Sequence, residues 1–378
     1  MKSKACVITA SRSEYGLLRW VMEAINNDSC FDLQVIATGA HLSPEYGLTY
    51  REIEKDGFEI NAKVEMLVSA DTATAIAKSM GLCAIGLSDA LDRLAPDFII
   101  VLGDRYELLP VCSTALLMRI PIVHISGGDI TEGAIDNEIR NAVSQMATLH
   151  FPGTKESANH LEEMGIPRDR IVVVGEPGLD AFRKMPLLSR AEISEQLGLN
   201  ISDKWILLTY HPETKKSPEE NLEVLKILVQ ELLDRTDAQI IATYANADEG
   251  GRMINAYLEE VSTEAGARFK VSKSLGQQMY ISLMNESALI AGNSSSGIIE
   301  APIIGVPVLN IGNRQKGRHL CKNIVTCASS KNSIQKTIDF LAKSGFPRYE
   351  PDFYYGNGNT GELIASELEA ARIVGERL

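Results

Sequence analysis

Residues 289–300 combine an apolar strand with the residue types of an anion-binding helix start. Leu-Ile-Ala-Gly leads into Asn-Ser-Ser-Ser-Gly and then into Ile-Ile-Glu, which predicts a helix that begins among the serines. The first N–H groups of a helix lack partners within it. With the hydroxyls of Ser294 and Ser295 and the helix dipole, they favour a phosphate. Glu300, about one and a half turns later, is placed to accept hydrogen bonds from ribose hydroxyls. The alternative is that these residues only cap the helix.

Acidic and basic side chains gather in two loops that follow predicted buried strands. Asp104 and Arg105 follow one strand directly, and Asp129 follows the next strand after a Gly-Gly turn. Asp136 and Arg140 come next and share one face of a predicted helix. The structural alternatives are a helix cap at Asp104 and a surface ion pair between Asp136 and Arg140. Crowded carboxylates push their pKa values apart, which suits the removal and return of a proton. We therefore favour acid–base chemistry here.

Further candidates stand at other strand ends, where open parallel sheets bind ligands. They are Arg12 and His41 in the first half, and His211, Asn246 and Arg314 in the second. Arg12 lies in a Ser-Arg-Ser loop that can hold a phosphate, and an anionic ligand explains the basic loop around Arg314 in an acidic protein. His211 suits a phosphate ligand or a proton donor, and Asn246 suits contact with a base or ribose. The structural alternative for Arg12 is an exposed side chain beside a helix N-cap. For His41 and His211 it is a structural histidine, and for Arg314 it is a solvated loop.

Composition narrows the class of protein. The chain has 378 residues, 45% of them hydrophobic, and a net charge of −13, which argues against nucleic acid or an anionic membrane as partner. No apolar run reaches the roughly 18 residues of a membrane span, and a strand pattern at the N-terminus replaces a signal peptide. Six scattered cysteines without a C-x-x-C pair make disulfide and metal frameworks unexpected, so we expect a cytoplasmic protein without metal.

Apolar runs alternate with amphipathic patterns along most of the chain, which predicts parallel sheets covered by helices on both faces. Expected strands are 5–10, 33–38, 63–67, 98–102, 122–125, 150–152, 171–174, 205–209, 239–243, 269–271, 288–291, 307–311 and 324–326. Expected helices are 17–25, 75–94, 108–118, 137–147, 155–164, 219–233, 251–264, 277–283 and 361–377. The fold class is therefore α/β, with two doubly wound Rossmann-like domains facing a cleft. We expect one domain at 1–178, joined by the C-terminal helix 361–378, and the other at 179–360.

These motifs together resemble the UDP-N-acetylglucosamine 2-epimerase family, in particular its hydrolysing branch that feeds sialic-acid-like sugar synthesis. The resemblance covers nearly the whole chain and rests on the segments 11–16, 103–107, 127–129, 211–213, 293–297 and 312–318. It implies a fold of the glycosyltransferase-B type with no cofactor and a UDP-sugar substrate. It also implies that UDP is bound by Arg12, His211, Ser294, Ser295, Glu300 and Arg314. The residues implied around the sugar are Asp104, Asp136 and Arg140, with Arg105, His41 and Asp180 as weaker candidates.

The family reaction removes the proton on C2 while UDP leaves C1, hydrates the resulting glycal, and reprotonates C2 from the opposite face. Many members have a glutamate where this chain has Ser126, so proton transfer would fall to Asp104, Asp129 or Asp136. The substrate is UDP-N-acetylglucosamine or a UDP-2,4-diacetamido-2,4,6-trideoxy sugar of the legionaminic acid route. The alternatives are a glycosyltransferase on the same fold and a non-catalytic UDP-sugar-binding protein, which would not need the acid cluster. A homodimer is the expected assembly.

Overall fold

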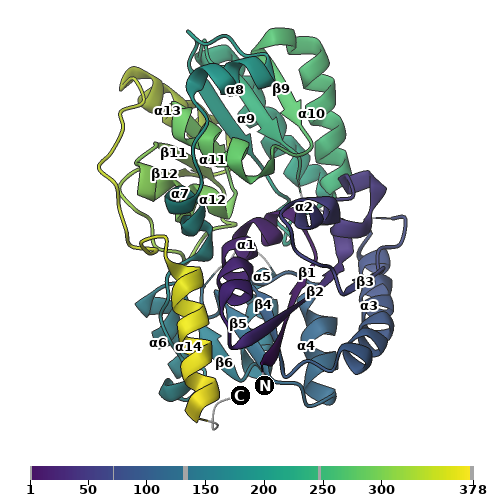
Figure 1. The fold of residues 1–378 in the computed structure, drawn as a ribbon. Coiled ribbons are helices and arrows are strands. Elements are labelled where there is room, and N and C mark those ends of the chain that lie inside the picture. Colours follow the sequence, from purple (N-terminus) through teal and green to yellow (C-terminus); the bar gives the residue numbers. More distant parts are fainter. Residues whose placement is uncertain (1, 71, 131–134, 246–247, 375–378) are drawn as a thin grey trace. The chain divides into compact units, whose positions relative to one another are not determined.

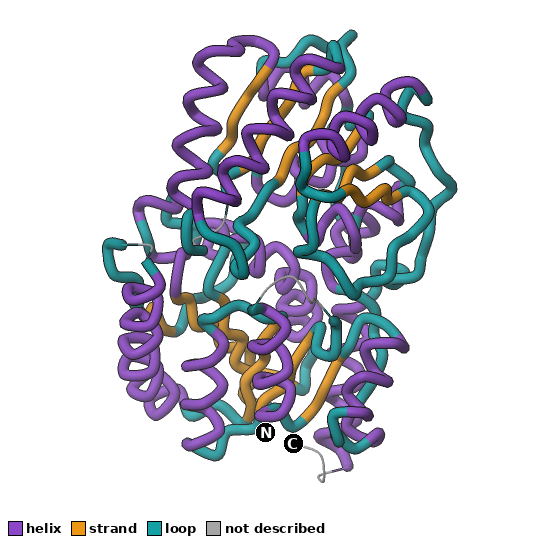
Figure 2. The backbone as a smooth tube through the Cα atoms, turned by 180° about the vertical axis from the view of Figure 1, so that it is seen from behind, coloured by secondary structure: helices purple, strands orange, loops and turns teal. Residues whose placement is uncertain are grey.

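The computed structural model describes residues 2–70, 72–130, 135–245 and 248–374. It contains two parallel six-stranded sheets with helices along them (Figure 1; Figure 2), which confirms the predicted α/β class. The chain divides into two compact units. The N-terminal unit comprises Met1–Ile130, Asp136–Arg183 and Tyr355–Leu378, and the C-terminal unit comprises Thr131–Ile135 and Lys184–Tyr354.

The sheet of the N-terminal unit has the order β3-β2-β1-β4-β5-β6, the strand order of a Rossmann fold. Its strands are β1 (Ser3–Thr9), β2 (Phe31–Thr38), β3 (Ala62–Val64), β4 (Phe98–Leu102), β5 (Ile122–Ile125) and β6 (Leu149–Phe151). Its helices are α1 (Arg12–Asn27), α2 (Tyr50–Lys55), α3 (Ala73–Leu94), α4 (Leu108–Leu117), α5 (Asp136–Met146), α6 (Lys155–Glu163), α7 (Asp180–Lys184, which reaches the unit boundary) and α14 (Thr360–Val374).

Alternation along the strands divides the apolar residues of this sheet between its two faces. Val7 and Ile100 pack on the side of α1 and α14. Their neighbours Ile8 and Ile99 pack on the side of α3 and α4. Because both faces are buried, the strands are apolar at successive positions, as the sequence pattern predicted.

The C-terminal unit has a second sheet of order β12-β11-β10-β7-β8-β9. Its strands are β7 (Trp205–Thr209), β8 (Gln239–Thr243), β9 (Phe269–Ser272), β10 (Leu289–Gly292), β11 (Val308–Ile311) and β12 (Ile324–Cys327). Its helices are α8 (Arg190–Leu197), α9 (Pro218–Arg235), α10 (Gly251–Ala265), α11 (Gly276–Glu286), α12 (Ser295–Ile299) and α13 (Lys331–Lys343). One core joins this sheet to α9, α10 and α13, and α13 was not among the predicted helices.

The strand predicted at 171–174 is wrong, since only Ile171 forms a bridge there, with His150. The segment does run beside β6, where Val172 N donates to His150 O over 2.9 Å and Val174 N donates to Pro152 O over 3.1 Å. A second bridge would need an N–H from Pro152, and proline has none. The ladder therefore stops after one pair.

Helix α14 belongs to the N-terminal unit although it lies at the far end of the sequence. It packs beside α1 (Figure 1), and Ile364 and Leu368 are buried in the same core as β1. Its first turn is capped by Asp180, whose two carboxylate oxygens accept the N–H groups of Thr360 and Gly361, each over 2.8 Å. Within the described residues, none of the helices has both the length and the apolar composition to cross a membrane.

Candidate active site

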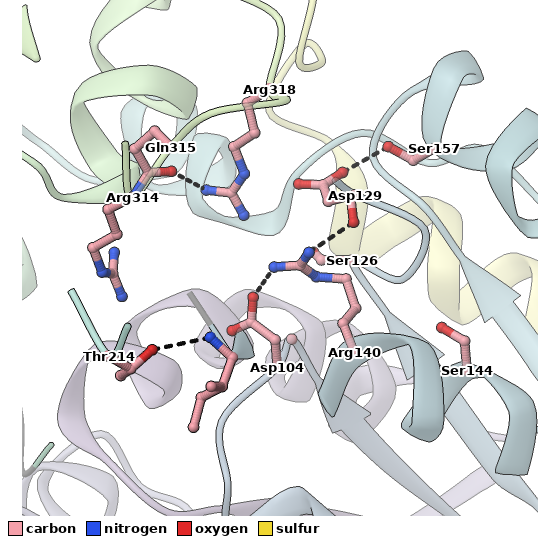
Figure 3. Close-up of polar contacts among 12 residues, drawn as sticks. Asp104, Ser126, Asp129, Arg140, Ser144, Ser157, Thr214, Arg314, Gln315 and Arg318 are labelled. Atoms are coloured by element: carbon pink, nitrogen blue, oxygen red, sulfur yellow. Dashed lines mark hydrogen bonds and ion pairs between the residues drawn. The ribbon is translucent and has the colours of Figure 1, made fainter. Parts of the chain in front are cut away.

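Arg140 joins two of the predicted acidic residues in the N-terminal unit (Figure 3). Its guanidinium donates from Nη2 to Asp104 Oδ2 and from Nη1 to the backbone carbonyl of Asp129, the latter over 2.7 Å. The Asp129 carboxylate in turn accepts from Ser157 Oγ over 2.6 Å. Arg140 is 1% exposed, whereas the Asp104 side chain is 25% exposed. The network thus presents a partly exposed carboxylate held by a buried cation.

His124, in β5, contacts the loops that follow β4 and β5. The imidazole of His124 is bonded to Ser144 Oγ (3.1 Å) and to Gly103 O (2.8 Å), so it ties the ends of β4 and β5 together. A Cβ at Gly127 would lie 2.8 Å from His124 Nδ1, which is why this position has no side chain. Burial lowers the pKa of His124 to about 4, so at neutral pH it is an uncharged structural group.

Ser126, where a glutamate was expected from the family, bonds to a carboxylate from elsewhere in the chain. Ser126 Oγ donates to Glu176 Oε2 over 2.6 Å. Glu176 is 4% exposed, and a Cβ at Gly153 would lie 1.9 Å from its Oε1. The N-terminal unit therefore places a buried acid next to Ser126, and the predicted site did not include it.

The entry to α1 holds a second buried acid. Ser11 caps the helix by accepting from Glu14 N. Glu14 Oε2 accepts from Ala10 N over 2.6 Å and from Thr9 Oγ1 over 3.2 Å. Burial, the largest cause, raises the pKa of Glu14 to about 7. The predicted phosphate ligand Arg12 is the first residue of this helix, and its contact with a ligand remains a prediction.

Three other predicted sugar-side residues have protein partners. His41 is fully buried, with its ring nitrogens bonded to Thr9 Oγ1 (3.1 Å) and Thr49 Oγ1 (2.9 Å), and burial lowers its pKa to about 3. Arg105 donates to both carboxylate oxygens of Glu107, each over 3.2 Å. The third, Asp180, caps α14. These contacts give all three a structural function, and their contacts with sugar stay predictions. Contact of sugar with Asp136, which is half-buried in the first turn of α5, is likewise a prediction.

Asn293 organises the predicted anion site in the C-terminal unit. Its amide accepts from His211 N and donates to His211 O, each over 2.8 Å. Its own carbonyl accepts from Gln315 Nε2 (2.9 Å) and Arg314 Nη1 (3.4 Å). The loops after β7, β10 and β11 therefore meet at one residue, Asn293. The candidates His211 and Arg314 are brought together through it.

The helix predicted to begin among the serines exists but is short. Ser294 caps α12, which begins at Ser295, by accepting from Ser296 N over 3.4 Å. Tyr280 and Ser296 share a hydrogen bond of 2.6 Å. Glu300 ends the helix, and burial raises its pKa to about 7. Burial thus favours the protonated form of this carboxyl, which can donate as well as accept a hydrogen bond.

Close backbone contacts fix this site. Gly292 has φ +129°, and a Cβ there would lie 2.0 Å from Thr209 O. A Cβ at Gly312 would lie 2.2 Å from Glu213 Oε1, a carboxylate that also accepts from Lys216 Nζ over 2.9 Å. In the basic loop, Arg318 donates to Gln315 Oε1 over 2.8 Å (Figure 3). Gly292 is required by the backbone at the end of β7, and Gly312 leaves room for the Glu213 carboxylate.

Asn246, predicted to touch a base or ribose, lies outside the described residues. The residues that sequence reasoning missed are Glu14, Glu107, Glu176 and Asn293. Glu14, Glu107 and Asn293 stand in the segments 11–16, 103–107 and 293–297 that carry the family resemblance, whereas Glu176 lies in none of those segments. Within the described ranges, no group of three or more His, Cys, Asp or Glu side chains could hold a metal ion.

Comparisons of the sequence and of the structure with known proteins all match 2-epimerases of nucleotide sugars. The family model described as UDP-N-acetylglucosamine 2-epimerase matches residues 23–369. A GDP/UDP-N,N'-diacetylbacillosamine 2-epimerase (hydrolyzing) of Campylobacter jejuni is 40% identical, over 91% of this chain and 89% of its own. A UDP-N,N'-diacetylbacillosamine 2-epimerase (hydrolyzing) of Legionella pneumophila is 31% identical, over 96% and 94%. The crystal structure of UDP-GlcNAc 2-epimerase from Neisseria meningitidis bound to UDP-GlcNAc matches with a TM-score of 0.80 at 18% identity, over 97% of this chain and all of that one.

Proposed function

The chain belongs to the UDP-N-acetylglucosamine 2-epimerase family, and on that premise we propose that it is a hydrolysing 2-epimerase of a UDP-linked 2-acetamido sugar. The first candidate substrate is UDP-N,N'-diacetylbacillosamine, a 2,4-diacetamido-2,4,6-trideoxy sugar. The observation that carries this choice is the 40% identity, over 91% of the chain, to a relative named for the GDP- or UDP-linked form of this sugar. UDP-N-acetylglucosamine is the second candidate, because the family model is described by it.

In the proposed reaction the proton on C2 passes to a carboxylate. UDP leaves C1 with the electron pair of the C1–O bond, and a C1=C2 double bond remains. Water then adds its hydroxyl to C1, and C2 receives a proton on the opposite face. The products are UDP and a free sugar with inverted C2. Two proton transfers on opposite faces require two acid–base groups, and Asp104, Asp129 and Asp136 are the candidates.

Asp104 is the strongest of these candidates for proton transfer at C2. Its carboxylate is partly exposed, and its partner Arg140 is buried, so the carboxylate can reach a ligand while the guanidinium holds it in place. The Asp129 carboxylate is 6% exposed and already accepts from Ser157, which suits a supporting function. Asp136 is half-buried at the start of α5, and we assign it to the opposite face of the sugar.

The C-terminal unit would hold UDP as the leaving group. Arg314 and His211 converge on Asn293, and a cation beside a departing pyrophosphate stabilises the charge that develops there. Ser294, Ser295 and Glu300 would contact the phosphates and ribose from the adjacent turn. Arg12 at the start of α1 is a further candidate for the phosphates.

Incubation of the protein in deuterated water tests this proposal, with UDP-N,N'-diacetylbacillosamine and UDP-N-acetylglucosamine in separate reactions followed by NMR. We expect UDP and a free sugar that carries deuterium at an inverted C2, with the higher kcat/KM for the diacetamido substrate. Release of UDP without deuterium at C2 would indicate transfer or simple hydrolysis and would exclude a 2-epimerase. The homodimer and the cytoplasmic location expected from the sequence remain predictions, which light scattering and cell fractionation would test.

A further inference from the structure

The hydrogen bond between Ser126 and Glu176 joins segments that are 50 positions apart. Its length of 2.6 Å is that of a charge-assisted bond from a hydroxyl to a carboxylate. Glu176 is almost fully buried, and burying a carboxylate is costly unless it is hydrogen-bonded. The folded protein therefore needs a hydrogen-bond donor at this carboxylate, and Ser126 is one.

The backbone around both residues is fixed. Ser126 N donates to Phe151 O over 2.9 Å, and Glu176 N donates to Tyr355 O over 2.8 Å. Gly153 leaves the space that the Glu176 carboxylate occupies, since a Cβ there would lie 1.9 Å from Oε1. A side chain at Gly153 would displace the Glu176 carboxylate. The position of Glu176 is therefore fixed by three separate segments, which contain Ser126, Gly153 and Tyr355.

The conformation of Ser126 points to its hydroxyl as the reason for its presence. Ser126 has φ +57°, a left-handed conformation that costs energy for any residue with a Cβ. Gly127 and Gly128 follow it. A glycine at position 126 as well would relieve the strain, because glycine adopts this conformation at no steric cost. A serine in this conformation, with its hydroxyl on a buried acid, is typical of strain retained at a functional site.

The direction of the bond determines what the hydroxyl can do. A serine hydroxyl has one proton, and here the proton is donated to Glu176. Ser126 Oγ is then left as an acceptor at the carboxyl end of β5, in the same loop as Asp129. A ligand group that meets this oxygen has to donate.

We propose that Ser126 Oγ accepts a hydrogen bond from an N–H or O–H group of the sugar, and that Glu176 is a positioning residue that fixes the direction of the Ser126 hydroxyl. This inference rests on the proposed function, because it takes the bound ligand to be the sugar of a UDP-sugar. An acetamido N–H and a sugar hydroxyl are both suitable donors. The two candidate substrates differ at C4, where one has an acetamido group and the other a hydroxyl, and at C6, where only UDP-N-acetylglucosamine has a hydroxyl.

The pair Ser126→Gly and Ser126→Ala tests the proposal, because both lose the hydroxyl and only glycine relieves the backbone. We expect kcat/KM to fall by the same factor in both, about 10- to 100-fold for a lost hydrogen bond to a charged or strongly polarised group. The melting temperature should be higher for Ser126→Gly than for Ser126→Ala. Glu176→Gln should give a smaller loss, and the double variant Ser126→Ala/Glu176→Gln should be no worse than Ser126→Ala.

A second Ser–Glu pair provides the control. Ser189 Oγ donates to Glu192 Oε2 over 2.7 Å in the exposed first turn of α8, so Ser189→Ala and Glu192→Gln should leave kcat/KM unchanged. A loss confined to the diacetamido substrate would identify the C4 acetamido N–H as the donor. An equal loss with both substrates would identify a group common to the two sugars.

Two results would overturn the inference by different routes. If the wild type turns over a substrate and Ser126→Gly keeps the same kcat/KM, Ser126 has no function toward the sugar, and the proposed function stands. If the losses in Ser126→Ala and Glu176→Gln multiply in the double variant, the two residues act independently. A wild type that turns over neither substrate would instead reject the proposed function, and this inference with it.

Discussion

The buried guanidinium of Arg140 donates to the carboxylate of Asp104, which lies 36 positions earlier in the chain. Arg140 projects from α5, whereas Asp104 follows β4. The pair thus fixes the orientation of the carboxylate proposed to work at C2. A carboxylate with that function has to be held in one position, because small displacements of a reacting group reduce the rate severely.

Replacing Arg140 should therefore affect activity more than stability. For Arg140→Gln we expect kcat/KM to fall by about 100-fold or more and the free energy of unfolding to fall by about 1–3 kcal/mol. The stability loss is moderate because Asp104 is 25% exposed and water can solvate the carboxylate left behind. Urea unfolding and steady-state kinetics measure the two effects. The control is Arg235→Gln, which breaks ion pairs with Glu231 and Asp339 and should keep kcat/KM; equal activity losses in both variants would contradict the prediction.

Asp104→Asn should separate chemistry from binding. The amide keeps the size of the side chain but cannot accept the C2 proton, so kcat should fall by about 100- to 10,000-fold. The dissociation constant of UDP, measured by calorimetry, should stay at the wild-type value. Arg314→Gln should do the reverse and weaken UDP binding. Loss of UDP binding in Asp104→Asn would show that Asp104 serves the nucleotide instead.

Substituting Gly292 should destabilise the C-terminal unit and remove the UDP site proposed there. In Gly292→Ala the new Cβ would lie 2.0 Å from Thr209 O at φ +129°, so β7 and β10 must move apart. We expect a loss of about 2–5 kcal/mol and no measurable UDP binding. Gly198→Ala is the matched control, since Gly198 has φ +62° with nothing within 4 Å of the added Cβ. It should cost only about 1–2 kcal/mol, and similar losses in the two variants would refute the steric argument.

Glu14 should make the protein less stable as pH rises. Burial raises the pKa of its carboxyl from the ordinary 4.5 to about 7. Between these values the folded state therefore binds more protons than the unfolded state, and the free energy of unfolding falls with pH. Glu14→Gln removes this titration. Relative to wild type, its free energy of unfolding should rise by up to about 3 kcal/mol between pH 4.5 and pH 7.

Urea titrations of wild type and Glu14→Gln at several pH values measure the difference. The buried histidines act in the opposite direction, because burial lowers the pKa values of His41 and His124 and so favours the folded state as pH rises. They are present in both proteins and cancel in the comparison. A difference that stays constant across this pH range would mean that Glu14 is ionised in the folded state.

Features that depend on the local pattern of apolar and polar residues could be predicted from the sequence. The bounds of β4, β5, β7 and β8 agree with expectation, because each is a short apolar run with polar or turn residues on both sides. The predicted positions of Asp104 after β4, Asp129 after β5 and Arg140 in the following helix are also confirmed. Their partners could not be assigned in this way.

What the sequence did not reveal are contacts between distant segments. Arg140 meets Asp104 across 36 positions, Ser126 meets Glu176 across 50, and Asp180 meets Thr360 across 180. Such pairs have no periodicity, because the two segments are brought together only by packing of the sheets. The strand at 171–174 failed for a related reason, since its pairing depended on a proline in its neighbour.

Helix α14 has a consequence for synthesis on the ribosome. The core of the N-terminal unit lacks Ile364 and Leu368 until the last part of the chain has emerged, and Asp180 has no helix to cap until then. The C-terminal unit is contained within Lys184–Tyr354 apart from a short segment, so all of its strands emerge earlier. Domains that fold during synthesis usually do so in order from the N-terminus. Here the half that is made first is the half that is completed last.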